Sequence, residues 1–108
     1  MVRPSRFDVL LVRLDPIRGS EIRKTRPCAV ISPDEMNHAL RTTIVAPMTT
    51  GGHAYPWRVP VRFSRKDGWI ALDQMRTVDR ERLDRKLGVL PDETAAELLQ
   101  RLAEMFAP

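Results

Sequence analysis

Apolar and polar residues alternate in several short segments of this chain, which is the pattern of half-buried β-strands. The first segment, RFDVLLVRLDP, places Phe7, Val9 and Leu11 on one face and Leu10 and Val12 on the other. It therefore predicts a strand that is buried on much of both sides. Further strands are predicted at 26–32, 41–47, 57–63, 68–75 and 87–90.

Helical patterns are fewer. Single helical turns are expected within SPDEMN, where Ser32 or Asp34 would act as the cap, and within RTVDRERLDRK. A longer helix is expected near the C-terminus, with Asp92 as its cap. Its apolar positions recur at helical spacing and belong to the core or to an interface: Ala95, Leu98, Leu99, Leu102, Met105 and Phe106.

Many short strands, frequent prolines and one terminal helix predict a mainly β (α+β) fold, a small barrel with the helix packed against it. At 108 residues the chain is long enough for one core, so we expect a single domain over 1–108. Pro60 cannot donate a hydrogen bond to a neighbouring strand, which places the strand at 57–63 at a sheet edge or a bulge.

Charge is unevenly distributed along the chain. Residues 1–90 carry a net charge of +7 and residues 91–108 a net charge of −3, and 15 of the 18 basic residues are arginine. The planar guanidinium fork of arginine matches pairs of phosphate oxygens. The composition therefore indicates either a polyanionic partner or a basic surface that binds nothing.

Cys28 is the single cysteine, so an internal disulfide is excluded, which fits a reducing cytoplasm. Its position in PCAVI favours a small buried apolar residue over a nucleophile. No apolar segment approaches the roughly 20 residues of a membrane span, and MVRPSRFD lacks the apolar run of a secretion signal. We therefore expect a cytoplasmic protein.

Metal and nucleotide chemistry find little support in the sequence. His38, His53 and Cys28 lie in separate segments with no ligand pair at helical spacing, and no phosphate-binding GxxxxGK[ST] motif is present. Three groups of polar residues remain as candidates for chemistry: Glu21 and Arg26, Thr49 and Thr50, and Asp73 and Gln74.

These groups are sufficient to cleave RNA without a metal ion or cofactor, because RNA carries its own nucleophile, the 2′-hydroxyl. Glu21 would be the base, Arg26 the cation that stabilises the phosphate, and Thr49 a hydrogen-bond donor to a phosphate oxygen. Each has a simpler interpretation. In that interpretation Arg26 is a surface charge and Glu21 is a salt-bridge partner. Thr49 and Thr50 are ordinary strand-end residues, and Asp73 is a buried structural carboxylate bonded to backbone amides.

The order of the motifs resembles the MazF/PemK toxins of bacterial toxin–antitoxin systems. DPIRGSEIRKTRPCAVISPDEMN is followed by IVAPMTT, AYPWRV and LDQMRTVDRERL. The resemblance implies an SH3-like β-barrel related to the toxins that poison gyrase, a homodimer, and an acidic MazE-like antitoxin. It also implies sequence-specific, metal-independent cleavage of single-stranded RNA, with Glu21, Arg26 and Thr49 as the catalytic residues and no cofactor.

The residues expected to contact the substrate surround these three, and Tyr55 and Trp57 would stack on unpaired bases or else close the barrel or the dimer contact. Some family members carry an arginine where this chain has Ala71, which favours a structural or base-contacting role for Asp73 over an acid. The expected substrate-binding residues are Arg18, Arg23, Lys24, Thr50, Gly51, Tyr55, Asp73 and Gln74.

A second class of function stays open at this point. A non-catalytic binding module, either a gyrase poison of the same barrel fold or an RNA-binding adaptor, would need the cations and the aromatic residues. It would not need Glu21, Arg26 and Thr49 together.

Overall fold

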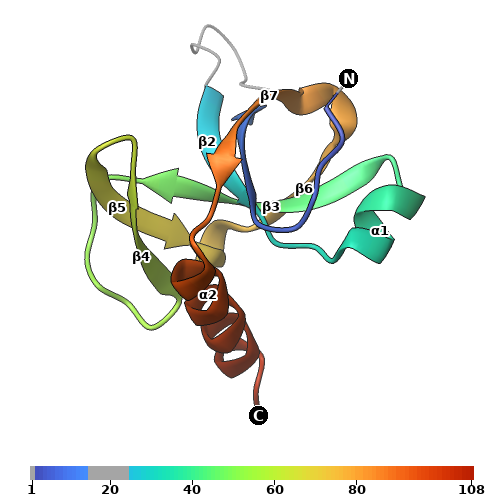
Figure 1. The fold of residues 1–108 in the computed structure, drawn as a ribbon. Coiled ribbons are helices and arrows are strands. Elements are labelled where there is room, and N and C mark those ends of the chain that lie inside the picture. The colour runs from blue at the N-terminus through green and yellow to red at the C-terminus, as the bar shows by residue number, and fades with distance from the viewer. Residues whose placement is uncertain (1, 15–24) are drawn as a thin grey trace, which may run out of the picture.

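The computed structural model describes residues 2–14 and 25–108, and within these the chain forms one antiparallel sheet with a helix at its C-terminal end (Figure 1). The strand order is β4-β5-β3-β2-β1-β7, and β6 pairs with β3. The strands are β1 (Asp8–Arg13), β2 (Thr25–Val30), β3 (Thr42–Thr49), β4 (Arg58–Phe63), β5 (Lys66–Ala71), β6 (Arg76–Asp79) and β7 (Leu83–Val89).

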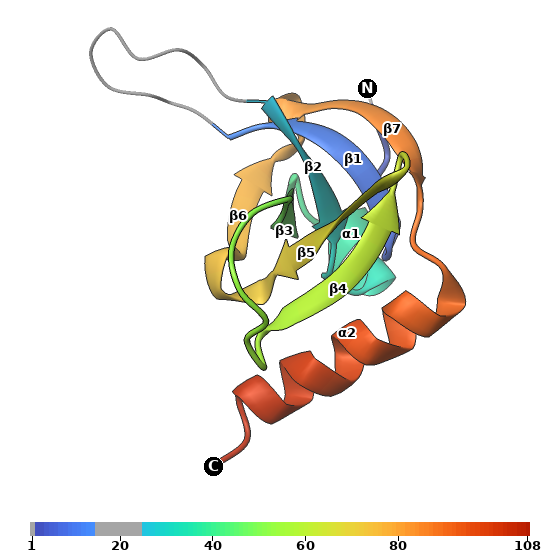
Figure 2. The same ribbon diagram turned by 90° about the vertical axis from the view of Figure 1, so that its left-hand side faces the viewer.

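Strand β3 holds the sheet together because it pairs with three others. Along one edge it pairs first with β6 and then, at Met48 and Thr49, with β5, while Val45 to Pro47 pair with β2. The sheet curls around this strand into a half-barrel (Figure 2). The predicted mainly β barrel with a C-terminal helix is confirmed.

The helices are α1 (Asp34–Ala39), α2 (Asp92–Met105) and two short 3-10 helices, η1 (Leu72–Gln74) and η2 (Arg80–Arg82). The predicted side-chain caps are wrong: Pro33 and Pro91 occupy the cap positions, and no side chain caps either helix. The carboxylate of Asp34 instead accepts a hydrogen bond from the backbone N–H of Arg6 at 2.7 Å.

The segment 76–86 is mostly extended, and its helical part is limited to the three residues of η2. Thr77 and Val78, both β-branched, pair with Ile44 and Thr43 of β3, so this half of the segment becomes β6. The last strand also begins earlier than predicted, at Leu83, because its first residues pair with β1.

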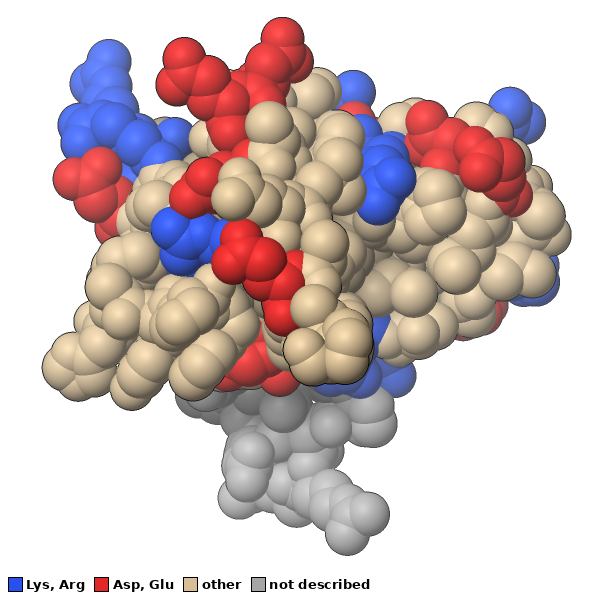
Figure 3. Space-filling view, turned by 90° about the horizontal axis from the view of Figure 1, so that it is seen from below, with Lys and Arg blue, Asp and Glu red and all other residues tan. Residues whose placement is uncertain are grey.

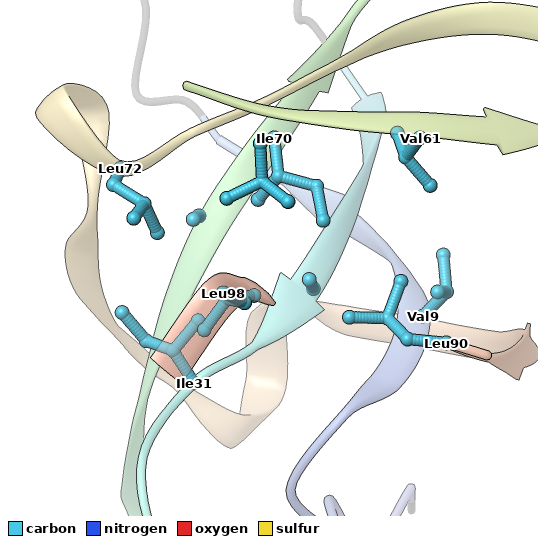
Figure 4. Close-up of a cluster of buried hydrophobic side chains, with 10 residues drawn as sticks. Val9, Ile31, Val61, Ile70, Leu72, Leu90 and Leu98 are labelled. Carbon is cyan, nitrogen blue, oxygen red and sulfur yellow. The ribbon is translucent and has the colours of Figure 1, made fainter. Parts of the chain in front are cut away.

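The main core lies between the curled sheet and α2. Leu98 of α2 points toward Val9, Ile70 and Leu90 in the same cluster (Figure 4). Ala95 and Leu98 are buried, but the other end of the apolar stripe is not core, since Phe106 is 70% exposed. The stripe therefore splits into a core part and an exposed part.

Two further predictions can be tested on the strands. Strand β4 pairs only with β5 among the described strands, so Pro60 lies on an edge strand as predicted. Cys28 is fully buried in β2, as predicted.

Within residues 2–14 and 25–108, no helix has both the length and the apolar character required to cross a membrane.

Candidate functional site

Arg26 and Thr49 line one cavity of about 490 Å³. They come from the adjacent strands β2 and β3, and Lys66, at the start of β5, adds a second cation to the wall. Most of the remaining lining residues are apolar. The other lining residues are Pro27, Met48, Thr50, Val61, Phe63, Ser64, Gly68 and Leu87. We call this the Arg26–Thr49 cavity.

The strand register explains why the two residues meet. Cys28 of β2 pairs with Pro47 of β3, and extending this antiparallel register by two residues sets Arg26 across from Thr49. On its other edge, Thr49 pairs with Trp69 of β5. Thr49 therefore lies between the strand that carries Arg26 and the strand that carries Lys66.

Gly68 allows β5 to approach Thr49 closely. A Cβ atom built on Gly68 would lie 2.4 Å from the carbonyl oxygen of Thr49, a distance at which the backbone must shift. Glycine is thus the residue that fits between these two strands. Neither Gly68 nor Lys66 was singled out from the sequence, although the Asp-Gly step at 67–68 is a recognisable turn signal.

The Thr49 hydroxyl is oriented by the loop that follows it. Its oxygen accepts a hydrogen bond from the backbone N–H of Gly51 at 3.3 Å. Because a hydroxyl carries one hydrogen as well as acceptor lone pairs, the Thr49 O–H remains able to donate. Thr50 also lines the cavity and is exposed.

Asp73 and Tyr55 lie in a second group, which we call the Arg58 cluster: Tyr55, Trp57, Arg58 and Asp73. The Nε and Nη2 atoms of Arg58 donate to the two carboxylate oxygens of Asp73, each at 3.2 Å. The Arg58 guanidinium lies 5.5 Å from the Tyr55 ring centroid. The rings of Tyr55 and Trp57 stack on each other, with centroids 5.0 Å apart and planes 6° apart.

The sequence gives no sign of a role for Arg58, although it has Ala71 where some family members carry an arginine. Arg58 of β4 pairs directly with Ala71 of β5, so the neighbouring strand supplies a guanidinium next to Asp73. Asp73 is therefore held by a guanidinium and is not a buried carboxylate bonded to backbone amides. Gln74 follows it in η1 and is exposed.

Glu21, Arg18, Arg23 and Lys24 lie outside the described residues. Among residues 2–14 and 25–108, no three His, Cys, Asp or Glu side chains are grouped as a metal site would require.

Burial raises the pKa of the Cys28 thiol from 9.0 to about 12, although the positive charges of Arg26 and Arg76 act in the opposite direction. A thiol with so high a pKa stays protonated at neutral pH and is a poor nucleophile. Cys28 therefore has a structural role beside the cavity.

Comparison with known proteins identifies the family. A family model described as a PemK-like, MazF-like toxin of type II toxin–antitoxin systems matches residues 5–106. The chain belongs to this family. Endoribonuclease PemK of Escherichia coli is 32% identical to this PemK/MazF family member over 107 residues, which cover 94% of this chain and 80% of that protein. Endoribonuclease MazF of Staphylococcus saprophyticus is 37% identical over 99 residues, covering 86% and 82%.

Solved structures of PemK/MazF toxins share the fold. MazF from Deinococcus radiodurans superposes with a TM-score of 0.79 at 24% identity and covers 97% of both chains. A mycobacterial endoribonuclease in complex with its cognate antitoxin gives a TM-score of 0.81 at 21% identity, also over 97% of both chains. The resemblance noted in the sequence motifs is thus confirmed over nearly the whole chain.

Proposed function

We propose that the protein is an endoribonuclease toxin that cleaves single-stranded RNA at specific sequences without a metal ion. The observation that carries this proposal is that Arg26 and Thr49, from adjacent strands, line one cavity. The family match and the names of the two relatives, PemK and MazF, both described as endoribonucleases, support the same activity.

The proposed reaction uses the 2′-hydroxyl of the RNA. The 2′-oxygen forms a bond to phosphorus while the bond from phosphorus to the 5′-oxygen breaks, so the products are a 2′,3′-cyclic phosphate and a 5′-hydroxyl. Glu21 takes the 2′ proton, or holds Arg26 in place while another base takes it. The departing 5′-oxygen takes up a proton from water as it leaves.

Arg26 and Thr49 stabilise the charge that builds up on the phosphate. The planar guanidinium of Arg26 donates two parallel hydrogen bonds to phosphate oxygens, and the Thr49 hydroxyl donates a third. Arginine rarely gives up a proton, so Arg26 acts as a cation rather than as an acid. Lys66, which also lines the cavity, adds positive charge to it.

Two partners follow from the same proposal. An acidic MazE-like antitoxin would bind the basic surface of residues 1–90 and compete with RNA, since both ligands are polyanionic. Among the similar structures, MazF of Deinococcus radiodurans occurs in a complex named MazE–MazF (TM-score 0.80, 25% identity). Binding of the antitoxin should weaken with salt and should block RNA cleavage.

The second partner is another copy of this chain. Leu99 and Met105 of α2 and the following Phe106 are exposed. The face that contains α2 consists largely of uncharged surface with acidic and a few basic side chains among it (Figure 3). Covering such a surface by a homodimer would bury apolar area that one small core leaves in water.

Incubation of the purified protein with a long single-stranded RNA in EDTA tests the activity. We expect cleavage that continues in EDTA, products with 5′-hydroxyl ends, and no cleavage at a site whose 2′-hydroxyl is replaced by hydrogen. Cleavage of the deoxy-substituted site, or loss of activity in EDTA, would contradict the proposal. RNA binding without any cleavage would indicate a binding module instead.

A further inference from the structure

Arg58 contacts three other parts of the chain: η1, the loop that precedes β4, and α2. It holds Asp73 of η1 through two hydrogen bonds of 3.2 Å and faces the Tyr55 ring at 5.5 Å. A Cβ atom built on Gly52 would lie 2.8 Å from Arg58 Nη1, so the glycine loop also packs on the guanidinium. The backbone carbonyl of Arg58 accepts a hydrogen bond of 2.6 Å from Arg101 of α2.

The side chains of the Arg58 cluster differ in how far they are exposed to solvent. The Arg58 side chain is 13% exposed, whereas the Asp73 side chain is 32% exposed. Tyr55 and Trp57 are each 38% exposed. The guanidinium is thus the covered support, and the carboxylate and the stacked rings are the groups that a ligand can reach.

The cluster is continuous with the Arg26–Thr49 cavity through two segments. The loop of Thr50 to Gly52 runs from the cavity wall to Arg58, and β5 runs from Gly68, beside Thr49, to Ala71, opposite Arg58. Since a strand advances about 3.4 Å per residue, a strand segment from 68 to 71 spans about 10 Å. A strand of RNA held in the cavity would therefore reach the cluster with a nucleotide close to the one that is cut.

The exposed groups define the chemistry of the ligand. Stacked aromatic rings favour an unpaired base, because every base has a π-face. A carboxylate has about four lone-pair sites and accepts hydrogen bonds only, and Arg58 uses two of them in Asp73. The remaining sites match an exocyclic amino group, as in adenine, cytosine or guanine, whereas uracil has a carbonyl in place of that group and only its ring N3–H as a donor.

We propose that Arg58 is a positioning residue for base recognition: it holds Asp73 and Tyr55 so that an unpaired base stacks on the Tyr55–Trp57 pair and donates its amino group to Asp73. This inference rests on the proposed RNA cleavage, and it assigns sequence preference at one position of the cut site to the Arg58 cluster. Arg58 acts through its neighbours and does not touch the reacting atoms.

The first experiment maps the 5′ ends of cleavage products from a random RNA pool. We expect the wild-type protein to prefer amino-bearing bases at one position, and Arg58→Ala to lose at least tenfold of that preference. Arg62→Ala is the matched control: it lies on the same strand and is 65% exposed, and it bonds Asp67 at 2.9 Å, away from the cluster. It should keep the preference of the wild type.

A second variant keeps the proposal testable if Arg58→Ala folds poorly. Asp73→Asn keeps the shape of the side chain but replaces one acceptor oxygen with an NH₂ donor. We expect it to shift the preference at the same position from amino-bearing bases toward uracil, with the melting temperature within a few degrees of wild type. A purely structural role of the ion pair would lower stability without moving the preference.

A binding measurement separates failure of this inference from failure of the proposed cleavage. In a Trp69→Phe background, Trp57 is the single tryptophan, and its fluorescence reports stacking directly. Single-stranded RNA should quench it, and Arg58→Ala should raise the RNA concentration required at least tenfold. The inference is overturned if RNA does not quench the fluorescence of the Trp69→Phe protein. It is also overturned if Arg58→Ala changes neither the quenching nor the base preference. Both outcomes can be read whether or not the RNA is cut.

Discussion

The α-carbon of Gly68 faces the backbone carbonyl oxygen of Thr49, with no space for a side chain between the two strands. This contact fixes the distance between β5 and the end of β3. It thereby sets the position of the Thr49 hydroxyl relative to Arg26 on the next strand.

We expect Gly68→Ala to destabilise the protein by about 1–3 kcal/mol, because overpacking against backbone forces β5 away from β3. Urea or thermal unfolding measures this change. The control is Gly51→Ala, since a Cβ atom there meets nothing within 4 Å. Equal stability of Gly68→Ala and the wild type would show that the strands separate without cost.

Arg26→Lys is expected to lower the cleavage rate at least about a hundredfold, near 2.7 kcal/mol of transition-state stabilisation, with the melting temperature little changed. Lysine keeps the charge but loses the planar fork that contacts two phosphate oxygens. Single-turnover kinetics on a defined RNA measure the effect. Arg85→Lys, on β7 and outside the cavity wall, should cleave at the wild-type rate. A wild-type rate for folded Arg26→Lys would remove Arg26 from the mechanism.

The variants Thr49→Val and Thr49→Ser distinguish the contribution of the Thr49 hydroxyl to the cleavage rate from that of the side-chain shape. Valine fills nearly the same volume but cannot donate a hydrogen bond, so we expect a loss of roughly 10²-fold in the cleavage rate. Serine keeps the hydroxyl, and we expect most of the rate to remain. Both rates come from the same single-turnover assay, and equal rates for the two variants would argue against a role for the hydroxyl.

The strands could be predicted because their signals are local. The alternation of Phe7 to Val12 and the proline inside 57–63 depend on neighbouring residues only. Arg26 and Thr49 were selected by the motifs around them, which carry the family resemblance, whereas their meeting in one cavity depends on the pairing of β2 with β3. Strand β6 was missed because its β-branched residues, Thr77 and Val78, lie in a highly charged segment whose pairing with β3 is a tertiary contact.

The Arg58 cluster could not be predicted for a related reason. The contact between Arg58 and Asp73 depends on the register of β4 against β5 and on η1 leaving the sheet. Neither the register of these strands nor the position of η1 follows from a local sequence pattern. The two residues are 15 positions apart, and nothing in the sequence distinguishes Arg58 from the exposed Arg62.

The buried thiol gives a pH-dependent prediction. The pKa of Cys28 is raised from 9.0 to about 12 in the folded protein, so the unfolded chain loses this proton first as pH rises. Stability should therefore be unaffected below pH 9 and fall above it, with a slope of at most about 1.4 kcal/mol per pH unit. Urea unfolding from pH 8 to 11 should show a shallower fall for Cys28→Ala, and equal slopes would contradict the prediction.

The proposed homodimer is tested by light scattering at micromolar concentration, where we expect about twice the 12.4 kDa of one chain. Phe106→Ser should shift the equilibrium toward monomer, because Phe106 is 70% exposed at the end of α2. Leu40→Ser is the control, since Leu40 is 48% exposed after α1, outside the proposed interface. Only monomers in the wild type would contradict the dimer.

The pairing of β1 with β7 has a consequence for when the protein becomes active during its synthesis. Val9 and Gly88 are partners in this pairing although they lie far apart in the chain, and Leu87 of β7 forms part of the cavity wall. A ribosome therefore releases Arg26 and Thr49 long before the strand that completes their cavity. The proposed RNA cleavage therefore becomes possible only after about the first 87 residues have been synthesised and β7 has paired with β1.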